Sequence, residues 1–210
     1  MKIKVCGITR QNDLQALSLS DQPVDFVGFV FYPPSPRYVA HEMPSLARIP
    51  KGIATQRVGV FVNESLSRVE ELARSYAFQL VQLHGQESAA YCQRLRQSFR
   101  VIKAFNVDAG FDFETLSSYA SCCDYFLFDA RGKLPGGNRI AFDWSLLQKY
   151  RLHVPFFLSG GISPVHTRQL LSFSHPSFFG VDINSGFEIA PGSKDIQAIR
   201  NFVKQLRQQV

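Results

Sequence analysis

The chain of 210 residues lacks a long apolar run, a low-complexity tract and a block of five or more basic residues. No stretch approaches the roughly 20 apolar residues of a membrane-spanning helix, and no signal-like segment follows Met1. We therefore expect a cytoplasmic protein without membrane contact. The formal net charge of +6 is carried by scattered Lys and Arg, so it does not indicate nucleic acid and is equally compatible with a small anionic ligand.

Cysteines at metal-ligand spacing are also lacking. The four cysteines form no CxxC pair, and none has a neighbouring histidine at such a spacing. Cys122 and Cys123 are adjacent, and adjacent cysteines rarely bridge to each other. We therefore expect reduced thiols and no metal. Cys92, Cys122 and Cys123 fall on or beside predicted helices, where packing is their expected role.

Apolar runs of strand length alternate with amphipathic segments along almost the whole chain. We predict strands over Ile3–Thr9, Phe26–Phe31, Arg57–Val62, Gln79–His84, Val101–Asn106, Tyr125–Ala130, Pro155–Ser159 and Phe179–Ile183. We predict helices over Asn12–Ser20, His41–Ala47, Ser65–Ser75, Glu87–Gln97, Phe113–Tyr119, Ser145–Tyr150, Pro164–Leu171 and Lys194–Gln208. Such alternation is typical of parallel strands joined by crossover helices.

Eight strand–helix units favour an α/β fold of one domain over residues 1–210, a closed (β/α)₈ TIM barrel. An open doubly wound sheet is the alternative, but no GxGxxG segment follows the first strand. The longest irregular stretches are Tyr32–Ala40 and Arg131–Asp143, and both follow strands.

Alternation along the strands predicts which side chains face the barrel interior. Lys4 and Cys6 share one face of the first strand, opposite Ile3 and Val5. The same reasoning groups Tyr125, Leu127 and Asp129, and it pairs Gln82 with His84, Lys103 with Phe105, and Asp182 with Asn184. Polar groups thus gather on the predicted interior face. Because isolated charges in an apolar barrel cost several kcal/mol, by order of magnitude, they should be paired or serve a site.

Two glycine-containing segments at predicted strand ends have the composition of an anion site. Ser159–Pro164 joins a glycine pair to a helix start, where backbone N–H groups and the helix dipole favour negative charge. Asp182–Gly186 follows the next strand, and phosphate in TIM barrels is frequently held by the loops after strands seven and eight. An ordinary tight turn is the alternative for the glycine pair alone.

Arg37 lies in a loop that contains Pro33, Pro34 and Pro36. Prolines restrict φ, so the loop limits where the guanidinium can point. A fixed guanidinium can hold a carboxylate through two parallel hydrogen bonds. We therefore expect a ligand contact, with a solvated surface charge as the alternative.

Motifs from Lys4 to Asp195 resemble the phosphoribosylanthranilate isomerase family of tryptophan biosynthesis: KVCGIT, GFVFYPPSPRYV, RVGVFVN, VQLHG, FDW, LSGGI, VDINSG and PGSKD. The resemblance implies a TIM barrel that converts N-(5-phosphoribosyl)anthranilate into 1-(2-carboxyphenylamino)-1-deoxyribulose 5-phosphate. The reaction is an Amadori rearrangement without metal or organic cofactor. The resemblance also implies a small phosphorylated substrate as the partner and leaves monomer and homodimer open.

The resemblance implies that Cys6 is the general base, Asp129 the general acid and Arg37 the ligand of the anthranilate carboxylate. By motif position, the phosphate is assigned to Gly160, Gly161, Ser185 and Gly186. His84 is expected to line the pocket. Asp182 either bonds the ribose hydroxyls or braces the phosphate loop. We also expect Lys4, with Lys103 as a second candidate, to lower the pKa of Cys6 and keep part of its thiol ionised at neutral pH.

One departure from the family pattern lies in Gly136–Ala141, where a GG[ST]G segment is usual, and we expect the loop beside the acid to close differently. Two other functions remain open. The related ProFAR isomerase of histidine biosynthesis performs the same rearrangement with two expected aspartates, which Cys6 disfavours. A phosphate-binding barrel without catalysis is disfavoured by the joint presence of Cys6, Asp129 and Arg37.

Overall fold

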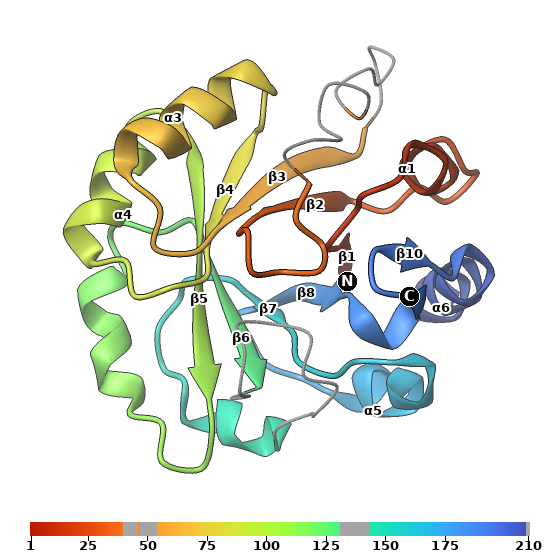
Figure 1. The fold of residues 1–210 in the computed structure, drawn as a ribbon. Coiled ribbons are helices and arrows are strands. Elements are labelled where there is room, and N and C mark those ends of the chain that lie inside the picture. Colours follow the sequence, from red (N-terminus) through yellow and green to blue (C-terminus); the bar gives the residue numbers. More distant parts are fainter. Residues whose placement is uncertain (40–45, 47–53, 131–142, 209–210) are drawn as a thin grey trace.

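A computed structural model of the chain describes residues 1–39, 46, 54–130 and 143–208. Eight parallel strands form one closed barrel, and helices surround it (Figure 1). The strands are β1 (Lys2–Val5), β2 (Phe26–Phe31), β3 (Gln56–Phe61), β4 (Leu80–Leu83), β5 (Arg100–Val107), β6 (Tyr125–Ala130), β7 (Phe156–Leu158) and β8 (Phe178–Ile183). The predicted TIM barrel is confirmed.

The described helices between the strands are partly α-helical and partly 3-10. The α-helices are α1 (Gln11–Ser18), α3 (Leu66–Ser75), α4 (Ala89–Arg96), α5 (Thr167–Ser172) and α6 (Ile196–Arg207). The 3-10 helices are η1 (Phe113–Tyr119), η2 (Trp144–Lys149), η3 (Pro164–His166) and η4 (Ser185–Phe187). The predicted helix His41–Ala47 lies outside the described residues except for Leu46, as does the predicted loop Arg131–Asp143 except for Asp143.

Strand bounds agree with the prediction to within one residue at each end, except in the first strand. There the prediction to Thr9 is wrong, because β1 ends at Val5. The Cys6 N–H still donates to the Ile183 carbonyl at 2.9 Å, but Gly7 then adopts φ +73° and turns the chain away. Cys6 is therefore held at the rim of the barrel.

Two predicted helices, η1 and η2, have the predicted positions but form the tighter 3-10 helix. In η1 the hydroxyls of Thr115, Ser117 and Ser118 donate to carbonyls three residues earlier. These side-chain bonds compete with the backbone for the same acceptors. A short segment with such competition does not reach the cooperative length of a stable α-helix.

The largest difference from the prediction follows β8, where a small antiparallel hairpin pairs β9 (Glu188–Ala190) with β10 (Ser193–Lys194). Pro191-Gly192 forms its turn, with Gly192 at φ +80°, a value that a type II turn requires at that position. Consequently α6 begins at Ile196 rather than Lys194, and the Asp195 side chain caps it by accepting from the Ala198 N–H.

Buried side chains divide into two layers, as the alternation predicts. Phe26, Val58, Leu80, Ile102, Leu127 and Phe157 pack inside the barrel with Cys6. Ile3, Val5, Phe126, Phe128, Val181 and Ile183 pack outside it, in the layer that also holds Cys92, Cys122 and Cys123. The predicted faces of Cys6, Leu127 and the outer residues of β1, β6 and β8 are confirmed.

Lys103 corrects one expectation. The sequence predicts Lys103 on the interior face, but its neighbours in β5, Ile102 and Ala104, are the residues that face the interior. The Lys103 ammonium lies 3.2 Å from Glu87 and donates to the Gly85 carbonyl at 2.8 Å, and both side chains of the ion pair are almost fully buried. Lys103 therefore forms a structural pair on the outside of the barrel and cannot serve the thiol inside.

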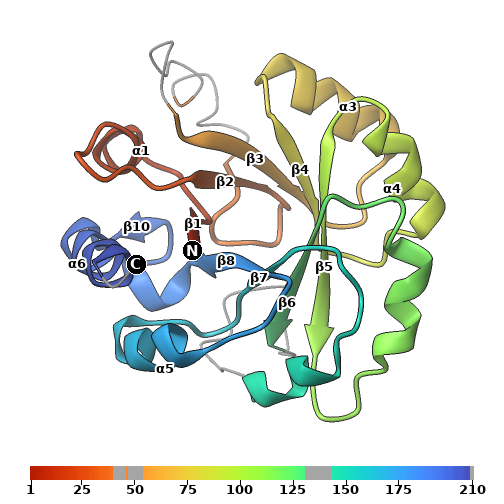
Figure 2. The same cartoon turned by 180° about the vertical axis from the view of Figure 1, so that it is seen from behind.

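Both ends of the chain are tied to the same carboxylate. The carboxylate of Asp25, between α1 and β2, accepts from the Lys2 ammonium at 2.8 Å. It also accepts at 3.2 Å from the guanidinium of Arg207, the last residue of α6. Seen from behind, α6 lies between α1 and α5 (Figure 2). No helix among the described residues is long and apolar enough to cross a membrane.

Removing one ring from the outer layer tests the packing of this barrel. The Phe128 ring is fully buried and lies 5.1 Å from Phe156 and 5.3 Å from Tyr150, centroid to centroid. We expect Phe128→Ala to lower the free energy of unfolding by about 3–5 kcal/mol in urea titrations. Val165→Ala, at a side chain that is 84% exposed, should stay within about 0.5 kcal/mol of the parent. A loss below about 1 kcal/mol for Phe128→Ala would contradict the packing.

Candidate active site

A single pocket at the carboxyl ends of the strands brings together every residue that the sequence predicts for the site. Its empty space is about 680 Å³, a volume that includes the open solvent at its mouth. Its lining includes Cys6, Arg37, His84, Asp129, Gly160, Gly161, Asp182, Ser185 and Gly186. It also includes Tyr32, Gln82, Ser159 and Asn184, which the prediction did not assign to a role.

A buried ion pair between the first and last strands lies next to Cys6. Lys4 is opposite Asp182 in the β1–β8 register, and its Nζ donates to Asp182 Oδ1 at 2.9 Å with both side chains buried. Burial disfavours the charge on Lys4, but the attraction of Asp182 and Cys6 outweighs this effect and holds the pKa of Lys4 above its usual value. Lys4 is therefore a charged neighbour of the thiol.

The prediction that part of the Cys6 thiol is ionised at neutral pH is wrong, because its pKa is raised. Burial raises the pKa of the Cys6 thiol, and the opposing attraction of Lys4 is smaller. Asp182 neutralises much of the Lys4 charge and itself disfavours a thiolate. The free protein thus keeps Cys6 protonated to a higher pH than an ordinary cysteine, and Lys4 limits the size of this shift.

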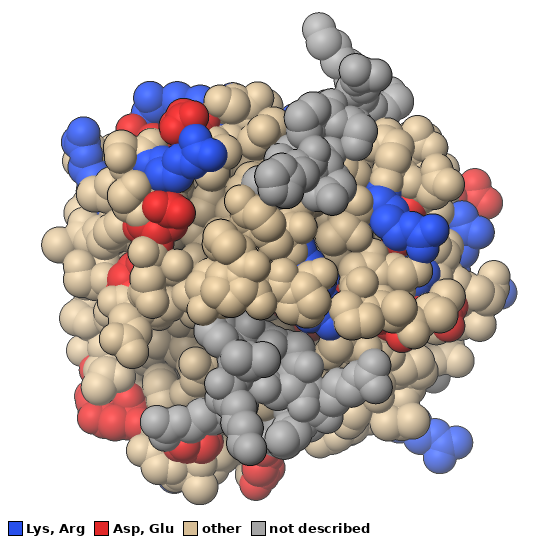
Figure 3. Space-filling view, in the orientation of Figure 1, with Lys and Arg blue, Asp and Glu red and all other residues tan. Residues whose placement is uncertain are grey.

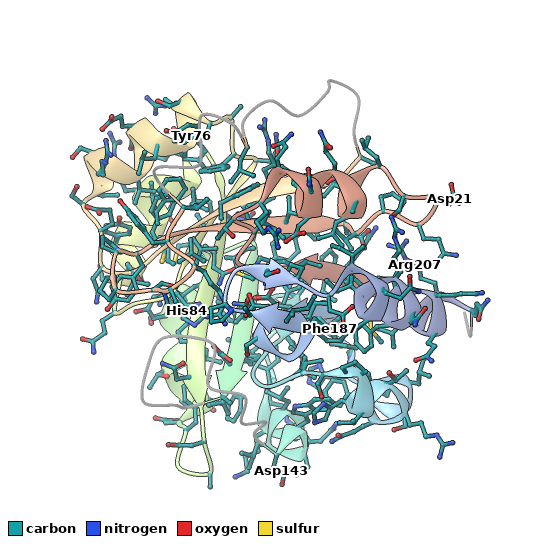
Figure 4. All side chains as sticks on the ribbon, turned by 45° about the vertical axis from the view of Figure 1, so that its right-hand side comes forward. Asp21, Tyr76, His84, Asp143, Phe187 and Arg207 are labelled. Carbon is teal, nitrogen blue, oxygen red and sulfur yellow. The ribbon has the colours of Figure 1, made fainter. Side chains whose placement is uncertain are left out.

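Asp129 and His84 form a second polar pair inside the same pocket. His84 Nε2 lies 3.2 Å from Asp129 Oδ2, and the Ala130 N–H donates to Asp129 Oδ1 at 2.9 Å. Gln82 Nε2 lies 3.0 Å from His84 Nδ1. An amide nitrogen only donates, so in this arrangement Nδ1 accepts and Nε2–H points to the carboxylate. Figure 4 labels His84, which follows the end of β4.

Arg37 is fixed by a carboxylate that the sequence argument did not include. Its Nε donates to Glu188 at 2.9 Å and its Nη2 at 2.6 Å, in the two-bond geometry of an arginine–carboxylate pair. The Arg37 and Glu188 side chains are 10% and 1% exposed. Arg37 is thus no solvated surface charge, and Glu188 is a partner that fixes its guanidinium.

The glycine of the KVCGIT motif makes room for this arginine. A Cβ on Gly7 would lie 2.6 Å from Arg37 Cδ and 2.9 Å from Asn184 Oδ1. Gly28 in β2 has a related role, because a Cβ there would lie 2.9 Å from Cys6 Sγ. Gly7 therefore leaves room for the Arg37 stem, and Gly28 leaves room for the Cys6 thiol and the Lys4 ammonium.

The glycine turns after β7 and β8 adopt conformations that leave backbone exposed to the pocket. Gly160 and Gly161 have φ of +85° and +63°, and no described residue accepts a hydrogen bond from either backbone N–H. A Cβ on Gly186 would lie 2.1 Å from the Ile162 carbonyl, so the two turns pack against each other. The predicted helix start at Pro164 is the three-residue η3 followed by α5.

Sequence reasoning missed Glu188 and Lys194, which do not line the pocket but bond to Arg37 and Asn184 in its lining. Lys194 Nζ donates to Glu188 Oε1 at 2.7 Å and to Asn184 Oδ1 at 2.8 Å, and its side chain is fully buried. The two residues face each other across the β9–β10 hairpin. The Pro191-Gly192 turn between them was the available signal, because a Pro-Gly pair marks a tight turn.

The described residues contain no group of three or more His, Cys, Asp or Glu side chains placed to hold a metal ion. On the face shown in Figure 3, basic and acidic side chains lie interspersed. The altered Gly136–Ala141 segment lies outside the described residues.

Fold and site together define a (β/α)₈-barrel protein with a pocket of charged and polar side chains at the carboxyl ends of its strands. The family model described as N-(5'-phosphoribosyl)anthranilate (PRA) isomerase matches residues 3–205. An N-(5'-phosphoribosyl)anthranilate isomerase from Phocaeicola vulgatus is 39% identical over all of both chains. The chain therefore belongs to the N-(5'-phosphoribosyl)anthranilate isomerase family, whose members are isomerases of tryptophan biosynthesis.

Two solved structures extend the similarity to three dimensions. A monomeric form of the dimeric phosphoribosylanthranilate isomerase from Thermotoga maritima is 32% identical, with a TM-score of 0.81 and 99% of each chain covered. A phosphoribosylanthranilate isomerase in complex with reduced 1-(o-carboxyphenylamino)-1-deoxyribulose 5-phosphate has the same identity, coverage and TM-score.

Alkylation of Cys6 tests the direction of its pKa. We expect the rate of carbamidomethylation of Cys6, followed by peptide mass spectrometry, to rise with pH at a midpoint above that of the urea-unfolded chain. Lys4→Met should move the midpoint higher still, because it removes the opposing positive charge and leaves Asp182 unpaired. A midpoint in the folded protein at or below that of the unfolded control would contradict this assignment.

A methyl group at Gly7 tests the fit around Arg37. Gly7→Ala places a Cβ against Arg37 Cδ and forces an L-residue into a left-handed backbone. We expect kcat/KM for the family reaction to fall by about 10²-fold, the scale of loss when a catalytic geometry shifts by about 1 Å. Gly110→Ala is the matched control, since its nearest atom is 3.6 Å away. Equal activity of both variants would refute the proposed constraint.

Proposed function

We propose that this chain converts N-(5'-phosphoribosyl)anthranilate into 1-(2-carboxyphenylamino)-1-deoxyribulose 5-phosphate, with Cys6 as general base and Asp129 as general acid. The observation that carries the proposal is the single pocket, which holds a thiol, a carboxylate, a fixed guanidinium and two glycine turns. Family membership supports the overall reaction. The resemblance to the family implies the role of each residue, and the geometry of the pocket supports these roles.

The first step opens the furanose ring. Asp129 in its acid form gives a proton to the ring oxygen as the bond from that oxygen to C1′ breaks, and the nitrogen lone pair forms a protonated Schiff base. His84 suits both protonation states of Asp129. In one tautomer Nε2–H donates to the carboxylate, and in the other Nε2 accepts from the acid.

Gln82 supports this exchange between tautomers. Its amide nitrogen meets His84 Nδ1, while its buried Oε1 has no hydrogen-bond partner among the described residues. Turning the amide over would present Oε1 to an Nδ1–H group, which is the arrangement that the second tautomer needs. The orientation of the Gln82 amide thereby matches the tautomer of His84, and the tautomer of His84 matches the protonation state of Asp129.

The second step removes the proton from C2′. The Cys6 thiolate takes this proton, and the electrons move toward the Schiff-base nitrogen to give an enolamine, which tautomerises to the ketone. Burial keeps Cys6 protonated in the free protein, so the thiolate must be favoured once substrate is bound. The positive charge of the protonated Schiff base supplies that attraction, together with Lys4.

The remaining contacts hold the two anionic ends of the substrate. Arg37 binds the anthranilate carboxylate, and the backbone N–H groups of the Gly160-Gly161 turn bind the phosphate with Ser185 and Gly186. Asp182 Oδ1 is taken by Lys4, so we assign its other oxygen to a ribose hydroxyl. A covalent role for Cys6 is not needed, because the rearrangement requires only proton transfers.

Two alternative functions are ProFAR isomerase activity and ligand binding without catalysis. The related ProFAR isomerase is expected to have an aspartate at the position of Cys6, and the family match is to the anthranilate enzyme instead. A barrel that binds the phosphorylated ligand without catalysis would keep Arg37 and the glycine turns but show no turnover. The assay below separates this case from the proposal.

Loss of the substrate's anthranilate fluorescence measures the reaction directly. We expect Cys6→Ser and Asp129→Asn to lower kcat by about 10²–10⁴-fold, the usual contribution of a positioned acid or base, with KM changed much less. Cys92→Ala, at a buried thiol outside the pocket, should retain turnover and serves as the control. No turnover by the parent protein, or full turnover by both site variants, would overturn the proposal.

A further inference from the structure

Three charged side chains meet beside the pocket and are almost completely buried. Glu188 accepts from Arg37 and from Lys194, and the side chains of Glu188 and Lys194 are 1% and 0% exposed. Buried charges of this kind require compensation, because the protein interior solvates them poorly. Arg37, Glu188 and Lys194 are called the charge cluster below.

The charge cluster carries one positive charge in excess. It contains two cations and one carboxylate, and no other carboxylate of the described residues forms an ion pair with Arg37 or Lys194. The nearby carboxylates are engaged elsewhere, since Asp182 pairs with Lys4 and Asp129 faces His84. An anion that enters the pocket beside Arg37 would therefore complete the cluster.

Glu188 also determines which edge of the Arg37 guanidinium can bind such an anion. It occupies the edge of the guanidinium formed by Nε and Nη2, which leaves the edge formed by Nη1 and Nη2 for a ligand carboxylate. Lys194 in turn donates to Glu188 Oε1, the oxygen that also accepts from Arg37 Nε, and the Arg37 stem lies against Gly7. The guanidinium is thus restrained by contacts from three segments of the chain.

The hairpin that carries Glu188 and Lys194 is itself firmly anchored. Phe187, labelled in Figure 4, packs against Phe202 of α6 with 4.8 Å between ring centroids. The Lys194 N–H donates to buried Asp13 in α1, and Thr9 donates to the Gly192 carbonyl. The charges therefore sit on a rigid element, as the positioning of a ligand group requires.

We propose that Glu188 and Lys194 are positioning residues that give the pocket its preference for a carboxylate on the aromatic ring of the substrate. Glu188 orients Arg37, and Lys194 holds Glu188 and provides the second positive charge. The inference rests on the proposed role of Arg37 as the ligand of the anthranilate carboxylate. Neither residue touches the reacting atoms.

Two stable ligands measure this preference without turnover. One is reduced 1-(o-carboxyphenylamino)-1-deoxyribulose 5-phosphate, and the other is the same compound with phenyl in place of carboxyphenyl. The ratio of their dissociation constants, from calorimetry, isolates the contribution of the carboxylate. We expect the parent protein to prefer the carboxylated ligand by about tenfold or more, as for a charge-assisted hydrogen-bonded pair.

The variants are chosen to separate charge from position. Glu188→Gln should reduce the ratio about fivefold or more while changing the affinity for the phenyl ligand less than about twofold. The double variant Glu188→Gln/Lys194→Met keeps the net charge of the cluster, since only Arg37 remains charged, and should also lose the preference. In turnover, KM should rise while kcat changes little for both.

The control is Glu87→Gln, which removes another buried lysine–carboxylate pair at the same end of the barrel, away from the pocket. It should lose stability but retain the full ratio. Glu188→Asp keeps the charge on a shorter stem, and it measures the same ratio if Glu188→Gln does not fold. We expect Glu188→Asp to show a reduced ratio because the carboxylate is withdrawn from the guanidinium.

The outcomes separate this inference from the proposed function. If Arg37→Met retains the preference for the carboxylated ligand, the assignment of Arg37 is wrong and the inference fails with it. If Arg37→Met abolishes the preference but the variants at Glu188 keep it, the assignment of Arg37 stands and the positioning role is overturned. A preference that rises in Glu188→Gln, where the cluster gains one positive charge, and stays at the parent value in the double variant would show that net charge, rather than orientation, decides the preference, and it would overturn the inference.

Discussion

Closure of β1 onto β8 is the constraint on which the rest of this structure depends. It pairs Lys4 with Asp182, which are 178 residues apart in the chain, and it leaves no edge in the barrel sheet. The contact of Thr9 with Gly192 and the pair of Arg37 with Glu188 cross the same junction. The thiol, the guanidinium and the hairpin are therefore neighbours because the barrel is closed.

The barrel separates an apolar interior from a charged rim. Aromatic and aliphatic side chains fill the barrel interior. The charged groups lie toward the carboxyl ends of the strands: the Lys4–Asp182 pair, the Asp129–His84 pair and the charge cluster. In this poorly solvated region each charge requires a partner, and the partner also fixes its direction. Burial thus orients Asp129, the Arg37 guanidinium and the surroundings of Cys6.

The fold and much of the site could be predicted from the sequence for physical reasons. Alternation with period two is a local property, so the faces of Lys4, Cys6 and Asp129 could be read from it. Lys103 obeyed the same alternation and was nevertheless misplaced, because period two does not say which of two faces points inward. The hairpin carrying Glu188 was missed because its strands are too short to show a pattern, although its Pro-Gly turn was visible.

The sequence by itself determined the strand order, the residue types available for acid–base chemistry and the glycine turns, since these depend on local pattern and composition. Tertiary structure alone decided which charges compensate each other, because partners such as Arg37 and Glu188 are 151 residues apart. It also decided the protonation of Cys6. Proximity to Lys4 predicted an acidic thiol, but burial of the thiol and the pairing of Lys4 with Asp182 reverse that direction. Desolvation depends on the whole surroundings of a group, which no short stretch of sequence specifies.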